Sequence, residues 1–370
     1  MGNQRLFTLD YLRGMAAFGI MIYHCYSWLY GVPADDSFLR KWGVYGVSSF
    51  YILSGLTLYH VYFYRMKPSA SDLKDFFLKR IFRIYPLLIL VILLTVASNR
   101  HLPDLKLLFL NLTGLFGFFK WDGYIGTGVW SIGNELVFYT FFPIFVYLSK
   151  KNKVAFIAFS MLLLSAFIYF AFFNLHIDAS LFNKDQWAIY VNPLNQVFLF
   201  LSGYLMGQYL THMKFSSWVN ISIFMIALIA FIFYVPVGLN LAAGINRVIL
   251  FAASFLLCLA FYKNTFRLIP TVDNSLRFLG EASFSIYLLH PIVFIILKFI
   301  ATVLKIQLSP IIHLSAAVAI TLLSSYFCYT YFELYFIRLG KKVTGKINKP
   351  VAGEDEAAIR MATSGSANNV

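Results

Sequence analysis

Two residues capable of chemistry, Arg13 and His24, interrupt the first strongly apolar stretch of the chain, Leu9 to Leu29. At about 100° and 1.5 Å per helical residue, the eleven steps between them place both side chains near one helix face, roughly 16 Å apart along the axis. Charged groups are costly in hydrocarbon, so an arginine there normally faces a polar partner, a bundle interior or a water-filled cavity. The spacing therefore predicts polar chemistry inside a membrane.

A carboxylate, Glu135, is predicted at a depth similar to that of His24. If the first helix rises from the cytoplasm, His24 lies about 22 Å above the inner boundary, whereas Glu135 lies about 7 Å below the outer boundary of a later, descending helix. Imidazole changes charge near neutral pH, and a nearby carboxylate orients it or stabilises its charged form. His24 with Glu135 is therefore a candidate general-base pair. The sequence does not say whether the two side chains touch.

A second cluster of cations, Arg80 and Arg83, precedes another apolar run in the segment Lys79 to Pro86. Residues three apart share a helix face, and two guanidinium groups there suit bidentate contact with phosphate. Arginines next to a membrane also set topology and bind lipid head groups. Both interpretations remain open on this evidence.

The composition requires membrane-spanning elements to position these residues, because 60% of the 370 residues are hydrophobic and only 12% are charged. Apolar runs of about 20 residues predict an all-α, polytopic membrane protein with about ten transmembrane helices. The stretch 105–119 is apolar but short, which favours a re-entrant or interfacial segment. The predicted spans are 9–29, 44–64, 82–98, 130–149, 154–173, 190–210, 218–237, 247–262, 281–304 and 311–336.

Lys and Arg collect in alternate loops and in the carboxyl-terminal tail, which predicts that both termini are cytoplasmic. This bias accounts for the net charge of +14, so nucleic acid is not an expected partner. Residues 1–338 are interpreted as a transmembrane domain and 339–370 as a polar cytoplasmic tail without a packed structure. The three cysteines have no paired spacing, so neither a disulfide framework nor a metal site is expected.

Five short motifs occur in order along these spans. They are Leu9-Asp10-Tyr11-Leu12-Arg13-Gly14 followed by His24, then Ser54-Gly55-Leu56, Arg80-Ile81-Phe82-Arg83-Ile84-Tyr85-Pro86, Trp130-Ser131 with Glu135, and Ser285-Ile286-Tyr287-Leu288-Leu289-His290. Together the motifs resemble those of the acyltransferase family 3 membrane proteins, which O-acylate bacterial polysaccharides and related glycans. The resemblance runs from about Leu9 to Arg338.

The resemblance implies roles for these residues. Activity in the family depends on the Arg and His of the first helix, here Arg13 and His24, to which we add Glu135 as a catalytic candidate. Arg80 and Arg83, with the neighbouring Tyr85, are candidates for the acyl-donor site, and acyl-CoA is the usual donor. The remaining motif residues are candidates for substrate binding, namely Ser54, Trp130, Ser131 and His290.

Ser54 and Gly55 equally suit close helix packing, and His290 before Pro291 equally suits repair of a helix kink.

The predicted function is thus a multi-pass O-acyltransferase of the bacterial inner membrane, with acyl-CoA, expected to be acetyl-CoA, as co-substrate and no permanently bound cofactor. Its acceptor is expected to be a hydroxyl of a surface glycan or lipid-linked sugar, with membrane lipids around it. The alternative is a proton-coupled secondary transporter or lipid-linked-sugar flippase, because buried Arg, His and Glu also suit transport. Transporters commonly contain matched broken helices, which the two halves of this chain do not show.

Overall fold

The computed structural model describes residues 7–99, 102–264 and 268–344, and the elements in these ranges are all helical. The all-α class is therefore confirmed. The predicted tail 339–370 is described only as far as residue 344, where its first residues continue a helix. The rest of that predicted tail lies outside the described residues.

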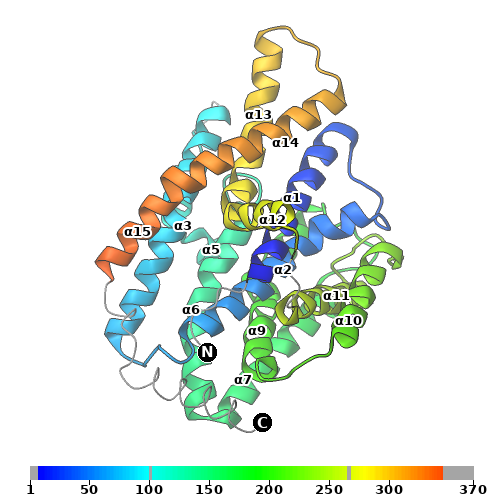
Figure 1. The fold of residues 1–370 in the computed structure, drawn as a ribbon. Helices are drawn as coiled ribbons and strands as arrows, with labels where there is room; N and C mark the ends of the chain where they lie inside the picture. Colours follow the sequence, from blue (N-terminus) through cyan, green and yellow to red (C-terminus); the bar gives the residue numbers. More distant parts are fainter. Residues whose placement is uncertain (1–6, 100–101, 265–267, 345–370) are drawn as a thin grey trace.

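The first half of the bundle is built from long helices separated by a short helical insertion (Figure 1). The segment 105–119 forms two short helices, neither of which is long enough to cross a bilayer. The elements are α1 (Phe7–Tyr30), α2 (Phe38–Tyr62), α3 (Ala70–Asn99), α4 (Leu105–Leu112), α5 (Phe116–Phe119), α6 (Val129–Lys151) and α7 (Lys153–Tyr169), which continues into a π-helical turn, η1 (Phe170–Asn174).

The second half ends in a long helix that returns beside α3 (Figure 1). Its elements are α8 (Lys184–Tyr190), α9 (Pro193–Leu210), α10 (Ser217–Phe233), α11 (Gly244–Lys263), α12 (Pro270–Glu281), α13 (Ser283–Val303), α14 (Pro310–Phe327), the π-helical segment η2 (Cys328–Glu333) and α15 (Leu334–Val343).

Each predicted span corresponds to one of these helices, but the boundaries differ. Six of the described helices have the length and hydropathy needed to cross a membrane, and α10 is a shorter apolar helix. The chain is therefore a membrane protein. The total of ten spans and the cytoplasmic placement of both termini stay predictions.

The largest boundary difference is in α3, which begins at Ala70, twelve residues before the predicted span at 82. The apolar pattern starts late because the first turns carry charged side chains, including Asp72, which suits a helix amino terminus. Arg80 and Arg83 consequently lie well inside a helix, about 15 Å and about 20 Å from its start, rather than at its entrance.

Close backbone contact holds the centre of the bundle together. A Cβ atom on Gly55 of α2 would lie 1.9 Å from the Phe200 carbonyl oxygen of α9, and one on Gly203 would lie 1.8 Å from that of Ile52. Only glycine fits at such a crossing, which is the way in which small residues let membrane helices approach. The contact fixes the face of α2 that carries Tyr51, Ser54 and Thr57 toward α1 and α6.

Candidate active site

Two histidines from distant parts of the chain form a hydrogen-bonded pair. His24 Nδ1 of α1 lies 2.9 Å from His290 Nε2 of α13, and the two rings stack at 5.1 Å between centroids. His290 Nδ1 lies 3.1 Å from the Ile286 carbonyl oxygen, which only accepts hydrogen bonds. In neutral rings His290 therefore donates from Nδ1 and accepts at Nε2, and His24 donates from Nδ1. This arrangement leaves a lone pair on His24 Nε2, as a general base requires.

His24 lines a cavity of about 690 Å³, which we call the His24 cavity. Its walls come from α1, α2, α3, α6, α8 and α13, and from the segments before α2, α6 and α8. Arg40, which bonds the Tyr23 hydroxyl, adds a guanidinium to a largely aromatic lining. The aromatic members are Tyr23, Trp28, Tyr124, Trp130, Phe182, Trp187, Tyr190 and Tyr287.

Hydrogen bonds fasten the loop segments that close this cavity. Asn111 of α4 donates to the Gly123 carbonyl at 2.8 Å and accepts from the Ile125 N–H at 2.8 Å. Trp187 Nε1 donates to the Tyr124 hydroxyl at 2.8 Å, which joins two segments more than 60 residues apart. The short α4–α5 insertion thus positions one wall of the His24 cavity.

Arg13 is held by partners on two helices. It pairs with Asp10 at 3.2 Å, donates to the Leu53 carbonyl at 3.2 Å and donates to the Thr57 hydroxyl. The guanidinium therefore faces the bundle interior and ties α1 to α2. Its hydrogen bonds satisfy the requirement that a cation at membrane depth have polar partners.

Glu135 lies against α2 rather than against His24. Its Oε1 accepts hydrogen bonds from Ser54 at 3.0 Å and from Tyr139, one turn farther along α6. Arg13 is within electrostatic range of the carboxylate. The structure thus brings Glu135, Ser54 and Arg13 into one polar group, separate from the histidine pair.

Arg80 occupies an aromatic cage between α2 and α6. Its guanidinium carbon lies 5.5, 5.9 and 5.7 Å from the ring centroids of Tyr62, Phe76 and Tyr139, and Nη2 donates to the Tyr62 hydroxyl at 3.1 Å. Its Nε is buried without a hydrogen-bond partner among the described residues. Arg83 is exposed and also lies within electrostatic range of Tyr139.

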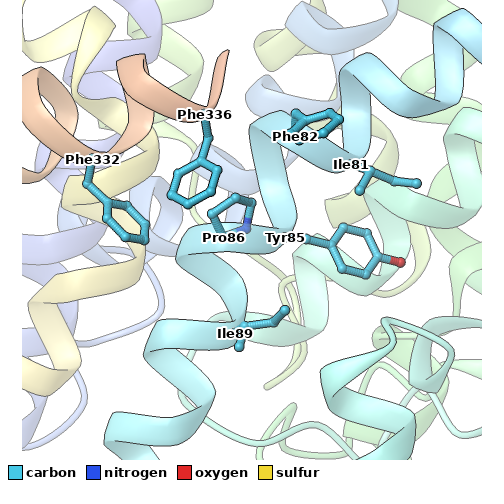
Figure 2. Close-up of a pocket in the computed structure, with 7 residues that line it drawn as sticks. All are labelled: Ile81, Phe82, Tyr85, Pro86, Ile89, Phe332 and Phe336. Atoms are coloured by element: carbon cyan, nitrogen blue, oxygen red, sulfur yellow. The ribbon is translucent and has the colours of Figure 1, made fainter. Parts of the chain in front are cut away.

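Tyr85 faces a different environment from the two arginines. Its hydroxyl donates to the Thr113 carbonyl at 2.7 Å, which anchors the end of α4 to α3. Its ring borders an apolar groove of about 340 Å³ between α3 and the last helical segments. Figure 2 shows Phe332 and Phe336 on one side of this groove, next to Pro86, with the Tyr85 hydroxyl directed away from them.

A series of contacts between α2, α6 and α13 lies between the Arg80 cage and the histidine pair. We call it, with Tyr139 of the cage at one end and His290 at the other, the polar path. Asn134 Nδ2 donates to the Tyr51 hydroxyl at 3.3 Å, which faces the Ser131 carbonyl at 3.5 Å. Ser131 Oγ then bonds Tyr287 Oη at 2.9 Å, and the Tyr287 ring lies 6.2 Å from that of His290. From Tyr139 to Ser131 the path spans about 12 Å along α6.

A comparison with known protein families identifies the family of this chain. A family model described as an acyltransferase domain matches residues 6–330, nearly the whole chain. The chain belongs to acyltransferase family 3. No curated protein and no solved structure matched it. It is therefore a membrane acyltransferase.

The sequence predicted candidate residues at both ends of this arrangement, whereas it assigned few of those between them. Tyr287 stood in a recognised motif without an assigned role, and Arg40 was not among the candidate residues. Asn134 gave no signal beyond its place beside Glu135, because a polar side chain in an apolar helix does not reveal its partner. Among the described residues no cluster of potential metal ligands is present.

Proposed function

We propose that this acyltransferase moves an acyl group, in the first instance acetyl, from acyl-CoA to a hydroxyl group of a glycan or lipid-linked sugar. The observation that carries the proposal is the His24–His290 pair at the wall of the His24 cavity. Its hydrogen-bond order leaves the outer nitrogen of His24 free to take a proton.

The transfer needs one base and correct positioning. His24 Nε2 removes the proton from the acceptor hydroxyl as its oxygen attacks the thioester carbonyl carbon. The carbon–sulfur bond breaks, an ester forms, and the CoA sulfur leaves with the electron pair and takes up the proton. Holding both reactants in one enclosed site makes this a near-unimolecular step. Direct transfer in this form requires no acyl-enzyme intermediate.

The donor site is proposed at the Arg80 end of the polar path. The positive-inside prediction makes this end cytoplasmic, where acyl-CoA is made. Arg80, with its unpartnered Nε, and the exposed Arg83 suit the phosphates of the CoA nucleotide. The pantetheine arm would extend along the polar path and bring the thioester toward His24.

The acceptor is proposed to enter the His24 cavity from the opposite side of the membrane. Aromatic rings offer flat apolar faces beside polar tips, which match the C–H faces and hydroxyl groups of a sugar. The proposed location is the bacterial inner membrane, with the acceptor on its outer side. Family membership favours transfer over the alternative of a proton-coupled transporter or flippase.

Mass spectrometry of cell-surface glycans tests the proposal. A deletion strain should lack an O-acyl group that returns on complementation with the wild-type gene and not with the His24→Ala variant. Identical glycan masses in the deletion and complemented strains, with the protein present in the membrane, would refute transfer to a surface glycan.

A further inference from the structure

Asn134 is an incompletely bonded member of the polar path. The residue is fully buried, with 0% of its surface exposed, and its Nδ2 donates to Tyr51. Its Oδ1 has no hydrogen-bond partner among the described residues. A buried amide oxygen without a partner costs about 1–3 kcal/mol, so such an atom in a native structure requires an explanation.

The position of Asn134 supplies that explanation. It lies on α6 between Tyr139, which borders the Arg80 cage, and Trp130, which lines the His24 cavity. In the next residue, Glu135, the Oε1 atom accepts hydrogen bonds from Ser54 and Tyr139. The open acceptor is therefore at the depth that lies between the proposed nucleotide site and the base.

The other end of the path has a complementary open group. Arg80 Nε is a buried donor without a partner among the described residues, whereas Asn134 Oδ1 is a buried acceptor without one. A ligand that satisfies both must present an anionic acceptor at the Arg80 cage and an N–H donor deeper in the bundle. Acyl-CoA has this order, because phosphates precede the two secondary amides of the pantetheine arm.

We propose that the Asn134 side-chain carbonyl accepts a hydrogen bond from an amide N–H of the donor's pantetheine arm and so sets how far the thioester reaches toward His24. This inference rests on the proposed function, since it requires acyl-CoA as donor. Asn134 is then a donor-binding residue that recognises the arm and not the nucleotide. No bond of the substrate is made or broken there.

Binding measurements on the purified protein in lipid nanodiscs separate the arm from the nucleotide. The probes are acetyl-CoA and adenosine 3′,5′-bisphosphate, which has no pantetheine arm. Asn134→Leu, which keeps the side-chain size, should weaken acetyl-CoA binding about tenfold and leave binding of the bisphosphate unchanged. The unchanged bisphosphate affinity also shows that the variant is folded.

Tyr51→Phe is the matched control, because it removes the same Asn134–Tyr51 hydrogen bond from the other side and leaves Oδ1 in place. Tyr51→Phe should leave the ratio of acetyl-CoA affinity to bisphosphate affinity near the wild-type value. An equal loss of acetyl-CoA affinity in both variants would show that the Asn134–Tyr51 bond alone matters and would overturn the inference. An unchanged ratio in Asn134→Leu would overturn it as well.

A measurement on the unaltered protein covers the case in which Asn134→Leu does not fold. An acetyl-CoA analogue with ester oxygens in place of the two amide nitrogens should bind the wild type about tenfold more weakly than acetyl-CoA. Equal affinity of the two compounds would refute the amide contact. Failure of the wild type to bind acetyl-CoA at all would instead refute the proposed function.

Discussion

The two ends of the polar path differ in how fully their hydrogen bonds are satisfied. At the His24 end, the hydrogen bonds run from His24 through His290 to the Ile286 carbonyl, so ring orientation and proton position are both determined. At the Arg80 end, three aromatic rings hold the guanidinium while its Nε stays unpartnered among the described residues. This difference agrees with the proposed roles, in which His24 transfers a proton and Arg80 receives the acyl donor.

The largest loss of activity is expected when the proposed base, His24, is removed. His24→Ala should lower acyl transfer by about 10²–10⁴-fold, because general bases contribute on that scale. Membrane insertion and donor affinity should be preserved, as measured by detergent extraction and by acetyl-CoA binding. His60→Ala is the matched control, since His60 bonds the Tyr262 hydroxyl at 2.9 Å away from the His24 cavity. A similar loss in both variants would indicate a general effect of removing a histidine from the helix bundle.

Removing only the group that orients the base should have a smaller effect. His290→Phe keeps an aromatic ring beside Trp28 and His24 but takes away the acceptor for the Nδ1 proton of His24. Loss of one such hydrogen bond is worth roughly tenfold in rate. Steady-state kinetics should show this loss in kcat with little change in the KM for the donor. An unchanged kcat would mean that His24 does not depend on His290 for its orientation.

The Arg80 end should respond in the opposite way. Arg80→Lys keeps the positive charge but loses the planar group that packs against Tyr62, Phe76 and Tyr139. We expect the KM for acyl-CoA to rise about tenfold while kcat changes less. The same substitution at Arg338, an exposed residue of α15, should alter neither constant. A fall in kcat at constant KM would contradict a donor-binding role.

The smallest effect is expected for a charged residue, Asp273, that lies outside both ends of the polar path. Asp273 of α12 accepts a hydrogen bond from the Tyr11 hydroxyl and forms an ion pair with Arg277 at 2.9 Å. These contacts hold the pKa of the Asp273 carboxyl below its ordinary value. A lowered folded-state pKa stabilises the protein above the unfolded-state pKa, and the contribution disappears as pH falls through the folded-state value. Asp273→Asn should therefore lower the unfolding temperature at pH 7 by no more than a few degrees.

The difference between Asp273→Asn and the wild type should shrink as pH falls below about 4, the usual value for Asp. Thermal unfolding in detergent at several pH values measures it. If the difference in unfolding temperature persisted at acidic pH, it would have to come from packing between α1 and α12 rather than from the charge of Asp273. Acyl transfer at neutral pH should stay close to that of the wild type.

Particular residues show where prediction from the sequence succeeded and where it stopped. Helical periodicity and the cost of a charge in hydrocarbon predicted that Arg13 faces the interior, and its bonds to Leu53 and Thr57 agree. Rise per residue predicted the depth of Glu135, but depth does not give the direction in which a side chain points. The carboxylate turned toward Ser54 on α2, while a histidine nearly 270 residues from His24 became its partner.

The sequence by itself determined the helical class, the apolar spans and the motifs that mark the family, because these follow from hydrophobicity and local spacing. Only the tertiary structure decided that His24 pairs with His290 and that Arg80 lies among three rings. It also decided that Asn134 Oδ1 has no hydrogen-bond partner among the residues that the structure describes. These contacts depend on how helices rotate and cross, for which the glycine contact of α2 with α9 is one cause. Such rotations are set by packing between distant segments, so no local pattern contains them.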